Sequence, residues 1–265
     1  MERHMMSQYS HRAVEELLAS TRLEDLRAGL NLLKQEISRV GSDEARELFE
    51  VLSTLFYLDP IERPDLLPIL EDAISLVVGF GKWIIPALLE KLDAGDFKAQ
   101  LAAASALGRI GADAVAPLIN EYRSRLDPDR QVFILYALGK IKSPRIVEAV
   151  PLALEAAASS HRELRDTATR AIGKLAESIT PQTLVPEVRM ALFEQLRKNL
   201  DDSNAGIRSK ALRSLGKFAR YGHLQANEKE LLKTICDRVL GRDEHYDWDR
   251  AYVVRREAEE ALSYL

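Results

Sequence analysis

The chain has 265 residues, 46% of them apolar and 29% charged, a composition that excludes disordered and collagen-like polymers and provides for a large buried core. The single cysteine, Cys236, excludes an internal disulfide, and the longest uncharged run, residues 99–108, is far shorter than the ~20 residues of a membrane span. The net charge of −4 argues against a protein coated by nucleic acid. Because residues 1–12 are polar and mixed in charge, unlike a secretory signal, we expect a cytoplasmic protein.

The N-terminal third predicts helices without a clear repeat. It is acidic, with 10 basic and 17 acidic residues in positions 1–95. Since a repeat becomes recognisable only further along, we expect a divergent helical cap and repeat over residues 1–63 and one continuous repeat array over residues 64–265. Helical periodicity is visible near residues 11–19, 22–40, 43–58 and 64–79, with Ser42 and Asp65 as expected N-terminal caps.

Five later segments share one column pattern. They are AQLAAASALGRI, QVFILYALGKI, LRDTATRAIGKL, IRSKALRSLGKF and VRREAEEALSYL. In the third copy the apolar or small residues Leu164, Ala168 and Ala171 precede the anchor Ile172 by eight, four and one positions, which is the stripe of an amphipathic helix. A face lined by such small residues predicts a closely packed neighbouring helix. The anchors of the five copies are Leu107, Leu138, Ile172, Leu215 and Leu262.

Glycine follows the anchor in four of the copies. Inside a helix it costs about 1 kcal/mol relative to alanine, so its recurrence indicates either that another backbone passes too close for a Cβ atom or that it eases the turn. A cation comes next, near the carbonyl end of the helix, where the macrodipole favours it. The glycines are Gly108, Gly139, Gly173 and Gly216, and the cations are Arg109, Lys140, Lys174 and Lys217.

Between the anchors lies a second amphipathic run, for example AVAPLINEY and ANEKELLKTICDRVL. The anchors are 31, 34, 43 and 47 residues apart, close to the spacing of two-helix repeats. No segment shows the sustained alternation of a β-strand. The sequence therefore predicts an all-α fold, a right-handed α-α superhelix of about fourteen helices in six to seven layers.

These columns resemble HEAT repeats, in particular the short kind first recognised in phycobilin lyases. That pattern has an acidic residue, an arginine, and then Ala-x-x-Ala-Leu-Gly-x-Ile-Gly; the resemblance is strong over residues 96–265 and weak before about residue 64. It implies a HEAT-repeat solenoid, armadillo-like in shape, and it specifies a scaffold without a reaction. The acidic and arginine columns hold Asp202 with Arg208, Asp249 with Arg255, and Arg165, whereas Gln100 and Gln131 replace the arginine in two copies, so we expect an incomplete ladder of ion pairs.

No catalytic, metal-binding or cofactor-binding residues are predicted. The sequence lacks the His-Glu dipeptides with which the HEAT-like deoxyhypusine hydroxylases hold two irons. Residues 243–249 alternate ligand side chains as in a calcium loop, but glycine is missing at the sixth position and Val254 stands where a glutamate would close the site. We interpret the segment as a solvated loop ending in a helix cap at Asp249. The aromatic residues Trp83, Tyr122, Tyr136 and Trp248 are scattered over unlike elements and are interpreted as core, not as the base-binding cleft of HEAT-like alkylpurine glycosylases.

Residues 96–265 are more basic than the N-terminal third, with 27 basic and 24 acidic residues. Four cations of one helix face away from Ala211 and Leu215, and no acidic residue of that helix offsets them; we call Lys210, Arg213, Lys217 and Arg220 the basic stripe. Its plain interpretation is a solvated face on which substitution by glutamine changes stability by less than about 0.5 kcal/mol. The alternative is a dock for an acidic protein, a phosphate-rich ligand or a nucleic-acid backbone.

The favoured function is a non-catalytic scaffold or adaptor that binds another protein. The alternatives are an accessory enzyme subunit of the phycobilin-lyase type and a nucleic-acid-binding HEAT-like protein, with nucleic acid the less favoured partner. Since the second helices line the concave side in HEAT arrays, their chemically mixed polar faces are the predicted partner surface. The candidate residues are Asn120, Ser124, Glu148, Glu155, Glu194, Arg197, Lys233 and Asp237.

Overall fold

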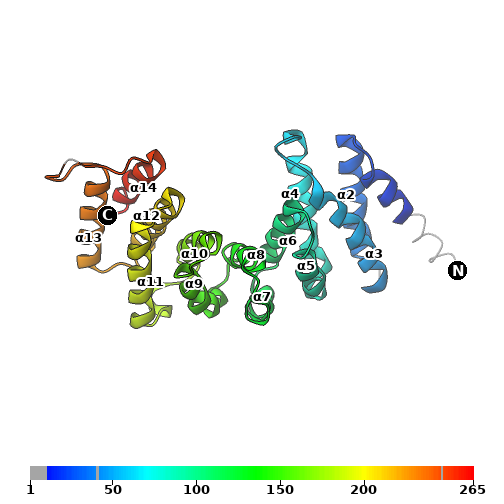
Figure 1. The fold of residues 1–265 in the computed structure, drawn as a ribbon. Coiled ribbons are helices and arrows are strands. Elements are labelled where there is room, and N and C mark those ends of the chain that lie inside the picture. The colour runs from blue at the N-terminus through cyan, green and yellow to red at the C-terminus, as the bar shows by residue number, and fades with distance from the viewer. Residues whose placement is uncertain (1–10, 40–41, 246) are drawn as a thin grey trace. The chain divides into compact units, whose positions relative to one another are not determined.

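The computed structural model describes residues 11–39, 42–245 and 247–265, without the side chains of residues 42–44. The expectations for residues 1–10 and for the Ser42 cap lie outside this part. Counting a helix at residues 11–18, the described residues form fourteen α-helices, and their one β-bridge joins Leu240 to Trp248. The all-α prediction is confirmed. The chain divides into two compact units, Met1–Ala114 and Val115–Leu265, and the dividing point falls inside α7 (Ala112–Ser124) (Figure 1).

The first unit buries its apolar side chains around a cluster of aromatic rings. Phe49 packs edge-on against Phe56 and Phe80, with ring centroids 6.5 and 5.9 Å apart. Asp65 is not a cap as expected, because its carboxylate accepts hydrogen bonds from the Arg63 guanidinium at 2.9 and 2.7 Å. The helices after residues 11–18 are α2 (Leu23–Ile37), α3 (Ser42–Ser53), η1 (Thr54–Tyr57), η2 (Pro64–Leu66), α4 (Leu67–Leu76), η3 (Val77–Phe80), η4 (Lys82–Ile84), α5 (Ile85–Lys91) and α6 (Phe97–Ile110).

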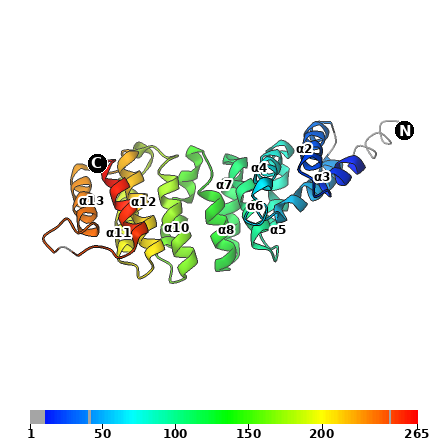
Figure 2. The ribbon, with the colours of Figure 1, turned by 90° about the horizontal axis from the view of Figure 1, so that it is seen from above.

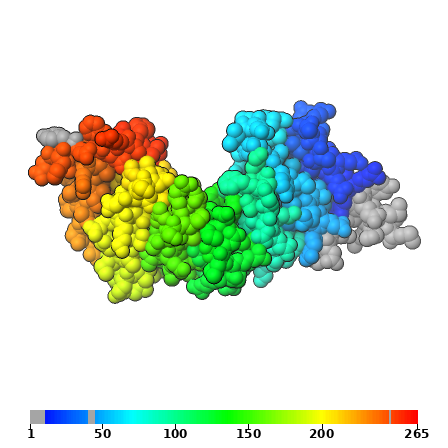
Figure 3. All heavy atoms as spheres, viewed as in Figure 1, coloured from blue at the N-terminus to red at the C-terminus, as the bar shows by residue number. Residues whose placement is uncertain are grey.

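The second unit consists of two layers of helices. The anchor-bearing helices α8 (Pro128–Leu138), α10 (Arg162–Leu175), α12 (Ala205–Arg220) and α14 (Tyr252–Leu262) pack in sequence order and form the first-helix layer (Figures 1 and 2). Successive repeats of this unit lie side by side in the space-filling view (Figure 3). The second-helix layer contains η5 (Pro144–Ala149) with α9 (Val150–Ala157), then α11 (Pro186–Lys198) and α13 (Ala226–Val239); η6 (Pro181–Thr183) and η7 (Asn199–Asp201) lie in connections.

The small-residue stripe is buried between neighbouring first helices, as predicted. Ala168 and Ile172 are both buried. A Cβ atom added to Gly173 would lie 2.8 Å from the Ser214 Cα atom of α12, closer than real Cβ atoms approach. At Gly216 the corresponding distance, to Ala261 Cα of α14, is 3.2 Å. Close backbone approach therefore explains these two glycines.

Gly139 differs from these two positions, because an added Cβ atom there would be 3.7 Å from the nearest backbone atom of α10, an ordinary contact.

The aspartate and arginine columns form ion pairs from one repeat to the next. Arg165 Nε lies 2.7 Å from Asp202 Oδ2, and Arg208 Nε lies 2.7 Å from Asp249 Oδ2. Each arginine also donates to a backbone carbonyl six residues earlier, at 2.7 and 2.8 Å. Gln131 donates to the backbone carbonyls of Tyr122, in α7, and of Arg125, in the loop that follows, at 3.1 and 3.4 Å. Glutamine thus holds the loop without reaching the next repeat, and the ladder is incomplete as expected.

Among the described residues no single helix has the length and hydropathy of a membrane span. One pair of helical segments, Pro64–Phe80 and Lys82–Lys91, meets those criteria only when taken together across a 110° bend.

Candidate functional site

The basic stripe lies on α12, which begins after Asn204 because that side chain accepts hydrogen bonds from the backbone N–H groups of Gly206 and Ile207. Ala211 and Leu215 on the opposite face are fully buried, as expected. No acidic residue of α12 offsets the stripe, as expected, but carboxylates from outside this helix pair with three of its four cations. These carboxylates lie on neighbouring repeats, more than 35 residues away along the chain, where the pattern of one helix cannot reveal them. The pairs are Lys210 with Asp166, Arg213 with Glu257, and Lys217 with Glu177.

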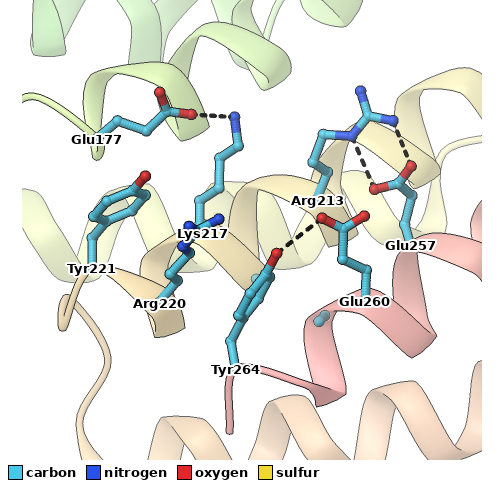
Figure 4. A pocket seen from close by; sticks show the side chains of 10 residues that line it. Glu177, Arg213, Lys217, Arg220, Tyr221, Glu257, Glu260 and Tyr264 are labelled. Carbon is cyan, nitrogen blue, oxygen red and sulfur yellow. Dashed lines mark hydrogen bonds and ion pairs between the residues drawn. The ribbon is translucent and has the colours of Figure 1, made fainter.

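A small pocket between α12 and α14 contains much of this charge (Figure 4). Arg213 Nε donates to Glu257 Oε2 at 2.9 Å, and Arg256 donates to the same carboxylate at 2.7 Å. The Glu257 side chain is only 1% exposed. Burial alone would raise the pKa of Glu257, but the hydrogen bonds and charges of the two arginines outweigh it and hold the pKa below its ordinary value.

Arg220 is the member of the stripe whose contacts are with aromatic rings. Its guanidinium carbon lies 5.6 Å from the Tyr221 ring centroid and 5.3 Å from that of Tyr264. The Tyr264 hydroxyl in turn donates to Glu260 at 2.9 Å, as Figure 4 shows. The stripe is therefore a set of contacts that joins α12 to α14, to α10 and to the loop after α10.

Three lysines surround the carboxylate of Glu177 in that loop. The Nζ atoms of Lys142, Lys174 and Lys217 lie 2.8, 3.2 and 2.5 Å from its oxygens. Burial would raise the pKa of Glu177, but the three ammonium groups lower it from 4.5 to about 2. One carboxylate cannot neutralise three cations, so this part of the first-helix layer carries excess positive charge.

Acid is expected to remove the stabilisation that Glu177 supplies. Because its pKa is lower in the folded chain than in the unfolded one, its contribution is fully present above pH 4.5 and is lost as the pH falls towards 2. By linkage the contribution at neutral pH is on the order of 3 kcal/mol. Urea unfolding of the wild type and of Glu177→Gln should therefore differ less in free energy at pH 3 than at pH 6. A difference that does not change with pH would contradict this account.

A second concentration of cations lies in the cleft between α8 and α10, and the sequence analysis did not identify it. The cleft contains Lys140, Arg170 and Lys174 with Tyr136 and Thr167, and no carboxylate is among its lining residues. The Lys140 Nζ atom lies 4.8 Å from the centroid of the Tyr136 ring. Two of these cations, Lys140 and Lys174, directly follow the repeat glycines. The recurrence of a cation at that position in successive repeats was the signal in the sequence from which the cleft could have been predicted.

The predicted partner residues are distributed along the second helices. Asn120 and Ser124 lie on α7, Glu148 on η5 and Glu155 on α9, and all four are exposed. Glu194 and Arg197 on α11 form an ion pair with 2.9 Å between Arg197 Nη2 and Glu194 Oε2. On α13, Lys233 is exposed and Asp237 half-buried.

Only Glu194 and Arg197 of this set line the groove between α11 and α13. Two adjoining cavities form that groove, and Leu231 lines both of them. The larger measures about 620 Å³ and contains Trp248, whose side chain packs over Gly241 and is 56% exposed. Trp248 is therefore not a core residue as expected, because its loop places the ring on the groove. Apolar lining residues are Met190, Phe193, Leu200, Leu231, Ile235, Val239 and Trp248, and charged ones include Lys198, Asp201, Arg238 and Asp247.

Residues 247–249 of the segment 243–249 line the groove. The Asp249 carboxylate accepts hydrogen bonds from the Arg208 guanidinium and from the backbone N–H of Ala251. Ala251 is the N-cap residue of α14. Asp249 therefore lies two residues before the helix cap position that the sequence assigned to it, and it serves the ladder of ion pairs.

Comparison with known proteins identifies the repeat and the fold. Residues 99–122 match the PBS lyase HEAT-like repeat, and no curated protein matches the chain significantly. The structure of Kap121p bound to Nup53p aligns with 98% of this chain and 29% of its own at 12% identity and a TM-score of 0.64. The complex of CpcE and CpcF of phycocyanin lyase from Nostoc sp. PCC7120 aligns with 68% of this chain and 98% of its own at 21% identity and a TM-score of 0.52.

A protein described as engineered aligns with 89% of this chain and 95% of its own at 19% identity and a TM-score of 0.52. At such identities these likenesses concern the fold alone. Three observations indicate the same fold. They are the two-helix repeats with buried small-residue stripes, the matched segment at residues 99–122 and these structural neighbours. The fold is that of an α-solenoid built from two-helix repeats, and residues 99–122 match the PBS lyase HEAT-like repeat.

Proposed function

We propose that this protein is a non-catalytic scaffold that binds a segment of a partner protein in the groove between α11 and α13. The observation that carries the proposal is the exposed apolar lining, in which Trp248 and Met190 are 56% and 53% exposed. Charged side chains border these apolar residues. An apolar centre with a polar rim is the arrangement of protein interfaces, and tryptophan is enriched among the residues that dominate their binding energy.

The comparisons support this class of function. Kap121p is described in complex with Nup53p, and CpcE in complex with CpcF, so solenoids of similar fold bind proteins. A long, mixed groove suits an extended segment, because side chains of the segment can enter the cavities on either side of Leu231.

Replacing Trp248 is expected to weaken peptide capture strongly. A phage-displayed library of natural peptide sequences would be selected on the wild-type chain and on Trp248→Ala, with enrichment read by sequencing. Tyr252→Ala is the matched control, because Tyr252 is 67% exposed but does not line the groove. Since an interface tryptophan typically contributes about 2 kcal/mol or more, enriched peptides should bind Trp248→Ala at least about tenfold more weakly. Equal binding to all three proteins would contradict the proposal.

The charged rim can be tested without disturbing the fold. Exchanging Glu194 for Arg and Arg197 for Glu retains an ion pair at i, i+3 on α11 while reversing the charge pattern that a partner meets. Peptides selected on the wild type should lose affinity for the exchanged variant, whereas its melting temperature should not change. Full retention of affinity would place the interface elsewhere.

The second candidate is an accessory subunit of the phycobilin-lyase type. The repeat at residues 99–122 and the alignment with 98% of the phycocyanin lyase chain support it. Addition of a free bilin to the purified protein distinguishes the two functions, because a bilin-handling subunit should shift the absorption band of the pigment and a protein scaffold should not.

A further inference from the structure

We infer that the cleft between α8 and α10 binds carboxylate side chains of an acidic segment in a partner protein. This surface belongs to the first-helix layer, so it is separate from the α11–α13 groove and does not depend on the function proposed for that groove. The argument rests on the cations that remain uncompensated after the ion pairs of the basic stripe are assigned.

Lys140 and Arg170 supply the uncompensated charge. Both side chains are exposed, and neither forms an ion pair within the described part of the chain. Arg170 and Lys174 lie four residues apart on α10 and therefore share one face of the helix. Lys174 is bonded to Glu177, but that carboxylate is already shared among three lysines. The cleft therefore presents positive charge to any ligand that enters it.

The cleft also contains neutral groups that suit a carboxylate. Thr167 lines it one helical turn before Arg170 on α10, and its hydroxyl can donate a hydrogen bond. Its volume is about 40 Å³, enough for one small functional group and far below the several hundred Å³ of sites that enclose a whole small molecule. A single carboxylate on a flexible side chain fits this combination of size and charge.

Two features favour an acidic polypeptide over nucleic acid. Proteins that bind single strands stack bases on free aromatic faces, whereas Lys140 of the chain itself covers the Tyr136 ring. The cleft, at about 40 Å³, also admits a single carboxylate but no nucleobase. A polypeptide can place one acidic side chain opposite Lys140 and Arg170.

The test uses two fluorescently labelled probes, a decapeptide of alternating glutamate and glycine and a ten-residue oligothymidine, with binding measured by anisotropy at 50 and 200 mM salt. We expect the peptide to bind the wild type more weakly at the higher salt. The double variant Lys140→Gln, Arg170→Gln should lose about three- to tenfold in peptide affinity, as expected for two partly screened charge contacts. Because both side chains are exposed, its melting temperature should equal that of the wild type.

The matched control is Lys82→Gln, Arg250→Gln, which changes the net charge equally at two exposed positions outside the cleft. Equal weakening by the control, no salt-dependent binding of the peptide, or tighter binding of the oligothymidine would each overturn the inference. Trp248→Ala should retain full affinity for the acidic peptide. That result separates failure of this surface from failure of the α11–α13 groove.

Discussion

Gly173→Ala is expected to destabilise the chain by about 1–3 kcal/mol, although alanine is the better helix former. The added Cβ atom would lie 2.8 Å from Ser214 Cα and closer still to the Ser214 hydroxyl, and such overpacking in a rigid contact between helices forces the backbones apart. The same displacement strains the hydrogen bond from Ser214 Oγ to the Thr169 carbonyl, now 2.8 Å. Urea unfolding measures the effect.

Gly139→Ala is the matched control for that substitution. Gly139 follows the anchor of its own repeat, but an added Cβ atom would meet only ordinary contacts. The substitution should therefore be neutral or stabilise the chain by up to about 1 kcal/mol, through the lower backbone entropy of alanine in the unfolded state. Combining Gly173→Ala with Ser214→Gly should recover only the part of the loss that the Ser214 side chain causes, because the contact with the Ser214 Cα atom remains. Equal effects of the two alanine substitutions would show that the helices α10 and α12 are not in close contact.

Arg213→Gln is expected to destabilise the chain by about 2–4 kcal/mol, because it leaves the buried carboxylate of Glu257 with Arg256 as its remaining ion-pair partner. If the basic stripe were a solvated face, the same substitution would change the free energy of unfolding by less than about 0.5 kcal/mol. Burial of Glu257 is the reason, because a buried carboxylate that keeps only one of its two arginine partners is only partly compensated. Unfolding in urea at neutral pH measures the loss.

Arg197→Gln is the control for Arg213→Gln. Arg197 also pairs with a glutamate, but both members of that pair are largely exposed, and exposed pairs contribute at most about 1 kcal/mol. Equal losses in the free energy of unfolding for the two substitutions would show that the Glu257 side chain is not buried.

The sequence alone predicts the helices and their buried faces well. The stripe at Leu164, Ala168, Ala171 and Ile172 is buried between helices, and the aspartate and arginine columns pair along the unit. Both patterns are local and recur with each repeat, so a regular array brings equivalent positions together without further information. Backbone geometry sets the periodicity of a helix, so the periodicity can be recognised in the amino-acid sequence alone.

The surfaces that meet a partner depend on the tertiary structure. The pairing of Arg213 with Glu257 joins residues 44 positions apart, and only the packing of α12 against α14 brings these side chains together. The exposure of Trp248 depends in the same way on the path of its loop beside α13. Sequence by itself determined the repeat, the all-α fold and the small-residue contacts. Tertiary structure decided which charges remain available in the α8–α10 cleft and which apolar side chains line the groove, because charge compensation and exposure are properties of neighbours in space.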